Sequence, residues 1–418
     1  MALAAAFLFL MGFGGPSDGP LESRSIALNG TASVLVERAV ALGIDFGNES
    51  LDENELSADG QALTQASPGA WLDAQIQVGD ESIAEAPRAL REYLEARGDS
   101  VWSIVAALEK QPPEWKDPKD RLVLPFPYLL PSIRLQKVLL AVALNEERNG
   151  NSINASRALE ASWSLARPFA ERSLLIHQIV AVAAQKGQAG VLRKMKEPAL
   201  QWLGRLGNNE PWRQILDSVT RDGDWSEASD ALTSADPFSE LIRKAPRSIA
   251  EGLEKLPPCD AAALGEEEVW HFAARELVMA SSQETAESRR VYREIFLPNV
   301  LSMIHRVARL SVDRELTLEI LKLRFEKAGD PAGRWPEKML NAVSAVCPAA
   351  SYSYRSGANG MEIRFEGSIV DPPSGSVLPL SFRSGHSRPP ELTPSPTPTP
   401  APPEIEPEAL DSSDTPEP

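Results

Sequence analysis

The sequence lacks two short motifs that commonly bind nucleotides. It contains no P-loop and no G-x-G-x-x-G turn, so the usual signals for a cradled phosphate or a bound dinucleotide are missing. We predict no cofactor. Hydrophobic material is not lacking, because 43% of the 418 residues are hydrophobic. That is enough for a packed core and for two or three domains.

A continuous basic stripe is also missing. The formal net charge is −17, and most of it lies at the two ends of the chain. Residues 1–62 carry nine acidic and two basic side chains, and residues 391–418 carry seven acidic and no basic ones. Binding to a phosphate backbone depends on Lys and Arg that displace counterions. We therefore expect no nucleic-acid partner.

Cysteine is scarce, since only Cys259 and Cys347 are present. Two cysteines cannot build a four-thiolate zinc or iron–sulfur site. They can pair, and a disulfide across their 88-residue separation would stabilise the fold by about 4 to 5 kcal/mol in the chain-entropy view. Two unrelated buried thiols are the other interpretation. Both residues are structural candidates, and the sequence leaves the two interpretations open.

The N-terminal segment from Met1 to Phe13 is uncharged and almost wholly apolar. As a helix it would span about 20 Å, less than the ~30 Å of a bilayer core. The length fits the apolar part of a signal peptide, but no Lys or Arg precedes it and no A-x-A site follows it. We expect export to the periplasm or cell envelope, with a membrane tether through this segment as a variant. A frayed terminus of a cytosolic protein is the alternative.

Helix-period apolar stripes dominate the chain between Ala84 and Lys327. Leu135, Val138, Leu139 and Val142, for example, recur at i, i+3, i+4 and i+7. Such stripes must bury against one another, so we predict a mainly α fold, built as stacked helical hairpins or as an irregular helical bundle. The helices are expected at residues 31–42, 81–96, 100–110, 174–184, 265–286 and 289–327.

Three glycines divide the central part at nearly equal intervals: Gly150, Gly187 and Gly223. Gly150 and Gly223 are each followed by Asn or Asp, and then by Ala four residues later, which fits a glycine that ends one helix and a cap that begins the next. This pattern resembles the turns of tetratricopeptide-like arrays. The resemblance covers only residues 131–240, so a helical repeat and chance spacing both remain open.

The pattern changes after Trp335. A short helix is expected at residues 337–346, followed by alternating segments on either side of the turn at Asn359-Gly360. Alternation around Asn-Gly predicts a β-hairpin, and residues 378–383 are expected to add a third strand. Beyond His386 the chain is rich in Pro, Thr and Glu and cannot bury a core.

These observations divide the chain into five regions. They are a signal-like segment (1–15), an N-terminal helix with an acidic linker at 45–68 (16–80), a helical domain (81–334), a small α+β module (335–386) and a disordered Pro-rich acidic tail (387–418).

The helical start Leu129-Leu130-Pro131-Ser132-Ile133-Arg134-Leu135, the step Gly333-Arg334-Trp335-Pro336 and the tyrosine-bearing hairpin together resemble a group of exported bacterial helical proteins of uncharacterised function. The step and hairpin are also similar to the C-terminal half of pseudopilins. The prepilin-peptidase signal is missing, so no pilin role is carried over. The resemblance transfers no catalytic residue.

A few polar residues could carry chemistry. Glu268 and His271 have the Glu-x-x-His spacing of di-iron bundles, but the sequence offers no second copy, and a solvated acidic helix start is favoured. His177 and His305 are interpreted as a core histidine and a basic helix edge. Nine tryptophans could line a peptide or glycan groove. For Trp163 we favour packing between helices.

We therefore expect a non-enzymatic, exported or membrane-tethered helical scaffold that binds a protein partner of unknown identity. The alternative is a metal-dependent or hydrolytic enzyme of the cell envelope, with Glu268 and His271 in a site between helices. A weaker third hypothesis is a pilin-like assembly component formed by residues 335–384.

Overall fold

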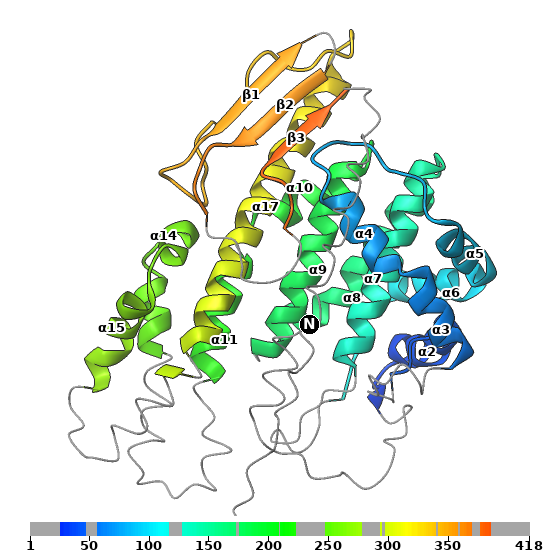
Figure 1. Ribbon diagram of the computed structural model, residues 1–418, viewed down its shortest axis with the longest axis horizontal. Helices are drawn as coiled ribbons and strands as arrows, with labels where there is room; N and C mark the ends of the chain where they lie inside the picture. Colours follow the sequence, from blue (N-terminus) through cyan, green and yellow to red (C-terminus); the bar gives the residue numbers. More distant parts are fainter. Residues whose placement is uncertain are drawn as a thin grey trace, which may run out of the picture. The chain divides into compact units, whose positions relative to one another are not determined.

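The structure is a computed structural model. It describes residues 26–46, 57–116, 128–172, 175–208, 210–222, 247–277, 293–294, 297–339, 342–357, 360–369 and 377–385. These residues form a mainly helical fold with one small antiparallel sheet, as the sequence predicted (Figure 1). The apolar start, Gly223 and the Pro-rich tail lie outside the described residues.

The N-terminal region is a group of short helices. They are α2 (Gly30–Ala39) with the 3₁₀ turn η2 (Val40–Leu42), α3 (Ala58–Ala66), α4 (Pro68–Ile76), α5 (Arg88–Ala96) and α6 (Gly98–Lys110). The side chain of Asn29 accepts the Ala32 N–H and begins α2, as expected of an N-cap.

Two predictions in this region were wrong. Residues 58–66, expected within an acidic linker, form helix α3, because the Ser57 hydroxyl accepts the Gly60 N–H and caps it. Residues 81–87, expected to be helical, are not part of a helix, and α5 begins only after Pro87.

Three long helices form the centre of the fold: α7 (Leu129–Arg148), α8 (Ser152–Ala170) and α9 (Leu175–Lys194). Gly150 separates α7 from α8 with φ at +83°, a conformation that glycine adopts most readily. Gly187, predicted to end a hairpin, instead lies inside α9, where a Cβ would come within 2.7 Å of a Leu140 methyl group. The second expected hairpin turn is therefore not a turn.

The C-terminal half is organised around the long helix α17 (Leu297–Gly329). Its neighbours are α10 (Gln201–Gly207), α11 (Glu210–Asp222), α14 (Pro258–Ala262), α15 (Glu266–Leu277) and α9. In Figure 1, α17 lies between α14 and α15 on one side and α9 on the other. Pro298 is its second residue, a position where proline costs no helical hydrogen bond.

The sheet has strand order β1 (Tyr352–Gly357), β2 (Gly360–Phe365) and β3 (Ser381–Ser384), all antiparallel. This confirms the predicted hairpin and third strand. The inward-facing residues pack on Val312, Leu316, Ile320 and Leu323 of α17; they are Tyr352, Met361, Ile363, Phe365 and Phe382.

The helix expected at residues 337–346 is not formed in the described part of that segment. Val343 instead pairs with Ser351, and hydrogen bonds from Ser344 N to Ala350 O and from Ala350 N to Cys347 O close a tight loop. The Pro348 ring cannot continue a helix from this point.

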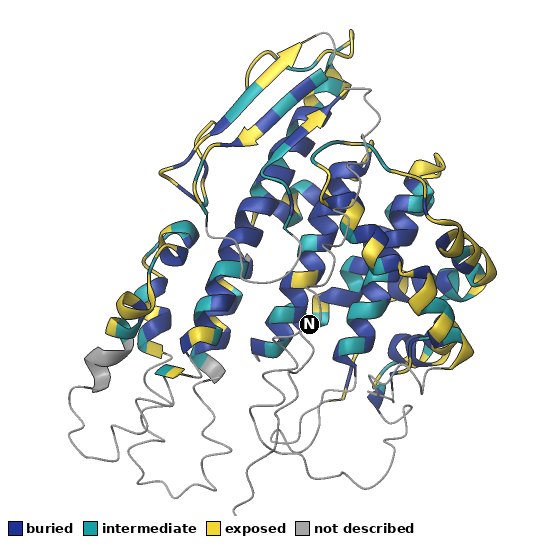
Figure 2. Ribbon diagram, in the orientation of Figure 1, coloured by how far each residue is buried: buried dark blue, intermediate teal, exposed yellow. Residues whose placement is uncertain are grey.

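Buried residues gather on α7, α8, α9 and α17 (Figure 2). Among the described residues, no helix combines the length and the apolar character needed to cross a membrane.

Candidate functional site: a buried polar junction between α9, α17 and the sheet

The most unusual feature of the described fold is a set of charged side chains in its interior. Arg193 and Lys194 end α9, while Arg309, Asp313 and Arg324 lie on α17. All five are at most 9% exposed. Ionised groups are rarely buried to this extent without partners. We call these five residues the polar junction.

Asp313 is the anion of the polar junction. Its Oδ1 lies 3.4 Å from Arg193 Nη2, and its Oδ2 lies 3.5 Å from Arg309 Nε. Burial raises the pKa of Asp313, and the two guanidinium groups oppose that rise. Burial also lowers the pKa of Arg193, against the attraction of Asp313. The ion pairs therefore offset a desolvation cost that each member carries alone.

The arginines also bind backbone carbonyl groups. Arg193 donates to Pro379 O at 2.7 Å and Arg309 donates to Leu378 O, both in the chain leading to β3. Arg324 donates to three carbonyls at the end of α9, including Arg193 O at 2.7 Å. A cation at these carbonyls complements the negative end of the helix dipole. The arginines thus tie α9, α17 and the β3 approach together.

Lys194 holds a fourth segment, residues 78–82, which we call the strap. The Lys194 Nζ donates to Val78 O and Ser82 O, both at 3.0 Å, and lies 3.7 Å from Asp80 Oδ1. Burial lowers the pKa of Lys194 to about 8, partly offset by Asp80.

The strap in turn pairs with the edge of the sheet. Arg383 N donates to Gly79 O at 2.8 Å, and Asp80 bridges to Arg383 in a parallel sense. The Glu81 carboxylate accepts hydrogen bonds from Ser384 and Gly385. Segments about 300 residues apart in the sequence are therefore joined. The strap also covers the edge of the sheet at β3.

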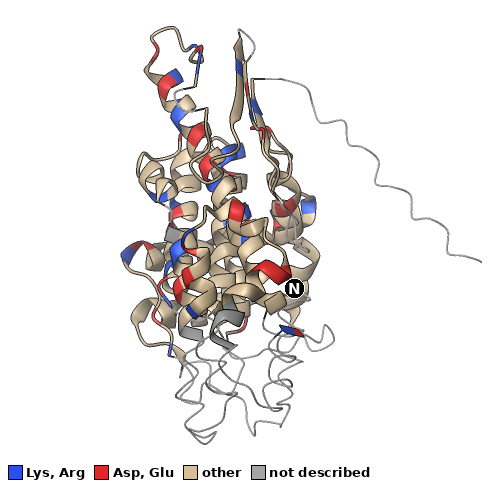
Figure 3. Ribbon diagram, turned by 90° about the vertical axis from the view of Figure 1, so that its left-hand side faces the viewer, with Lys and Arg blue, Asp and Glu red and all other residues tan. Residues whose placement is uncertain are grey.

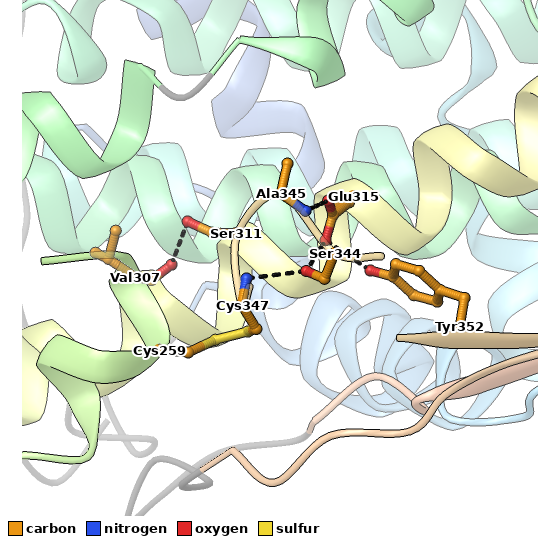
Figure 4. The surroundings of a disulfide bond; sticks show 8 residues. All are labelled: Cys259, Val307, Ser311, Glu315, Ser344, Ala345, Cys347 and Tyr352. Carbon is orange, nitrogen blue, oxygen red and sulfur yellow. Dashed lines mark hydrogen bonds between the residues drawn. A yellow bond between two sulfur atoms is a disulfide. The ribbon is translucent and has the colours of Figure 1, made fainter. Parts of the chain in front are cut away.

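A disulfide joins Cys259 of α14 to Cys347 in the loop before β1 (Figure 4). The Cα atoms are 5.2 Å apart. The structure thus forms the pairing that the sequence left open.

The carboxylate of Glu315, on α17, fixes the same loop by accepting hydrogen bonds from Ser344, Ala345 and Tyr352. Burial raises the pKa of the Tyr352 hydroxyl, and the neighbouring Glu315 raises it further. The loop is therefore held both covalently and by hydrogen bonds.

The chemistry available at the polar junction is structural. Its cations bind carbonyl oxygens and Asp313, and the Thr317 hydroxyl is used in the same way, because it accepts a hydrogen bond from Arg193 and donates one to Asp313 O. Across the described segments, no group of three or more His, Cys, Asp or Glu side chains could hold a metal ion. Figure 3 shows Lys, Arg, Asp and Glu positions along the helices next to the sheet.

The residues singled out from the sequence lie apart from the polar junction. Glu268 and His271 are exposed on α15, and the neighbouring Glu266 and Glu267 pair with Arg293. The arrangement is that of a solvated acidic helix start.

His177 is a core residue as predicted, whereas His305 is half-buried and its neighbour Arg309 is buried, so the solvated basic edge expected there is not formed. His177 is buried, stacked on Tyr128 and Phe169, with its Nε2 3.2 Å from the Tyr128 hydroxyl. His305 is half-buried, and burial lowers its pKa, while a hydrogen bond with the Ala262 backbone opposes that effect.

No direct signal for the polar junction is present in the sequence. Arg193 and Lys194 follow an apolar helix, where cations usually lie at the solvated C-terminal end. Arg309 and Asp313 have the i,i+4 spacing of an ordinary surface pair. A weak signal was available, since Asp313 falls within the long apolar stripe of α17.

Comparison with protein-family models, curated proteins and solved structures found no match for this chain. The likeness to exported helical proteins, to tetratricopeptide-like arrays and to pseudopilins therefore stays a prediction from the quoted residues.

Proposed function

We propose that this protein is a non-enzymatic helical scaffold, exported or membrane-tethered, whose surface binds a protein partner. The observation that carries the proposal is the Cys259–Cys347 disulfide. Disulfides persist in oxidising compartments outside the cytosol. An apolar N-terminal segment of signal-peptide length supports the same location.

The use of the buried charges supports a structural role. The polar junction ties four backbone segments together through hydrogen bonds to their carbonyl groups. Rigidity of this kind suits a protein whose surface must keep its shape in order to bind. The second hypothesis, a metal-dependent or hydrolytic envelope enzyme that uses Glu268 and His271, gains no support from the described side chains.

Two measurements in the native host test the proposal. Mass measurement of the protein with and without reduction, after cell fractionation, should show an exported protein with one disulfide. Photo-crosslinking groups placed at the exposed apolar positions Val40, Ile153 and Leu200 should give adducts of discrete mass, while the buried Leu139 serves as the control. A cytosolic protein with two free thiols, or no adduct at any exposed position, would overturn the proposal.

A further inference from the structure

Two tryptophans and a carboxylate form a partly covered corner between α8 and α10, with Trp202 buried and Trp163 half-buried. The Trp163 and Trp202 rings are 5.5 Å apart and meet at 82°, so their faces form two perpendicular walls. The Glu160 carboxylate, which is 26% exposed, lies within hydrogen-bond distance of Arg205 and Gln201 beside the two rings. Two aromatic faces with a nearby anion are the arrangement by which proteins hold organic cations.

A cation of the chain itself already occupies this corner. The Arg205 guanidinium carbon lies 4.9 Å from the Trp163 centroid and 4.7 Å from the Trp202 centroid. Its Nη1 is 2.7 Å from Glu160 Oε2. Arg205 therefore shows directly which kind of group the corner accepts.

The corner does not depend on the Arg205 side chain for its shape. Trp202 is 2% exposed and is part of the main hydrophobic core, against which Trp163 also packs. Gln201 Nε2 donates to Glu160 Oε1 at 2.7 Å, so the carboxylate keeps one hydrogen bond if Arg205 leaves.

The Arg205 backbone is held separately from its side chain. Its carbonyl accepts a hydrogen bond from the buried Arg314, which also binds Gln185 and Asn208. The side chain is 24% exposed and can therefore rotate into solvent while the backbone of α10 stays in place.

The surroundings of the corner favour contact with another protein. Leu200, next to Gln201, is 66% exposed, and Ile153, two helical turns before Glu160 on α8, is 80% exposed. Exposed aliphatic side chains beside an aromatic and charged site are typical of interfaces.

We propose that Trp163, Trp202 and Glu160 form a cation-binding corner, that Arg205 fills it in the free protein, and that a Lys or Arg side chain of the protein partner displaces Arg205. The inference rests on the proposed scaffold function for the existence of a partner. The cation site itself can be tested without one.

The test uses choline, with its uncharged isostere 3,3-dimethylbutan-1-ol as the comparison ligand, added to the full chain. Binding is followed by the shifts of tryptophan indole N–H resonances, with Trp163→Phe to assign the signal. Arg205→Ala should bind choline at least tenfold more tightly than the wild type, because the internal competitor is gone. Adding Glu160→Gln to Arg205→Ala should weaken binding several-fold.

Arg157 supplies a matched control. Its guanidinium carbon lies 5.5 Å from a single ring, Trp102, and it pairs with Glu109 at 2.7 and 3.0 Å. Arg157→Ala thus exposes one aromatic wall rather than two and should not gain choline affinity. Equal affinity in Arg157→Ala and Arg205→Ala, or equal binding of the uncharged isostere, would overturn the proposal.

Arg205→Gln is the second variant, because it removes the charge but keeps most of the side chain. Loss of the folded state in both Arg205 variants would overturn the claim that the side chain can leave. For the partner, the crosslink at Leu200 should weaken with Glu160→Lys while that at Val40 stays. Failure of Arg205→Ala to bind choline would contradict the cation-binding corner, whereas absence of all crosslinks would contradict the proposed scaffold function.

Discussion

Arg193 Nη2 and Asp313 Oδ1 lie 3.4 Å apart, although 120 residues separate them in the sequence. The carboxylate is fully buried and the guanidinium nearly so. Asp313 also faces Arg309, so two buried guanidinium groups share one anion. Removal of that anion leaves uncompensated charge in the interior.

Asp313→Asn should therefore lower the free energy of unfolding by about 3 to 5 kcal/mol, the usual cost of breaking a buried ion pair from one side. Denaturant unfolding measures the loss. Glu362→Gln is the control, since Glu362 pairs with Arg383 at 3.0 Å on the exposed face of the sheet and should cost less than about 1 kcal/mol. Similar losses in the two variants would contradict the structural role of the polar junction.

Lys194 should make stability depend on pH above neutrality. Its pKa is about 8 in the folded protein, against the ordinary value of 10.5. Between these values the unfolded chain binds the proton and the folded chain does not, so stability rises with pH across that window. Lys194 should therefore raise the free energy of unfolding by about 3 kcal/mol between pH 7 and 11.

Lys194→Met should abolish this part of the slope. The measurement is the free energy of unfolding of the wild type and the variant across the same pH range. Lys110→Met, at an exposed position, should keep the slope of the wild type. A parallel slope in the Lys194 variant would show that the ammonium group is solvated.

The sequence predicts the local elements of this fold and misses its long-range junctions. The hairpin from Tyr352 to Phe365 is predicted by period-two alternation and by the Asn-Gly pair, both local signals, and the register pairs Gly357 with Gly360. Helix α7 is likewise predicted by its apolar stripe, and its end before Gly150 is predicted by that glycine.

The missed junctions share a physical cause, which is contact between segments that are distant in the sequence. The strap at 78–82 is held in place because Lys194 and β3 bind its backbone, and neither partner can be predicted from the residues near it. The Trp163 corner needs α8 and α10 to meet. Packing of Trp163, by contrast, could be predicted from its place on an amphipathic helix.

Gly43 and Gly150 should differ in their tolerance of alanine. Both have positive φ, +73° and +83°, so alanine costs about 1 to 2 kcal/mol of backbone strain at either one. At Gly43 a Cβ would also fall 2.2 Å from the Asp59 carbonyl oxygen, whereas at Gly150 it meets nothing within 4 Å. Gly43→Ala should therefore lower the unfolding midpoint clearly further than Gly150→Ala. Equal losses would show that α3 does not approach this turn.

The disulfide should contribute strongly to the stability of the C-terminal half. Cys259 and Cys347 are 88 residues apart, so the bond restricts a long loop of the unfolded chain. The chain-entropy relation gives about 4 to 5 kcal/mol for a loop of this length. The bond also joins helix α14, which packs on α17, to the loop that begins the sheet.

Replacing both cysteines by serine should therefore lower the free energy of unfolding by up to this amount, measured by denaturant titration. Treatment of the wild type with a phosphine reductant should give the same loss, because both changes free the same loop. The single variants Cys259→Ser and Cys347→Ser should match the double variant, since either one alone breaks the bond. An unchanged midpoint after full reduction, verified by mass, would mean that the Glu315 hydrogen bonds to Ser344, Ala345 and Tyr352 suffice to hold the loop.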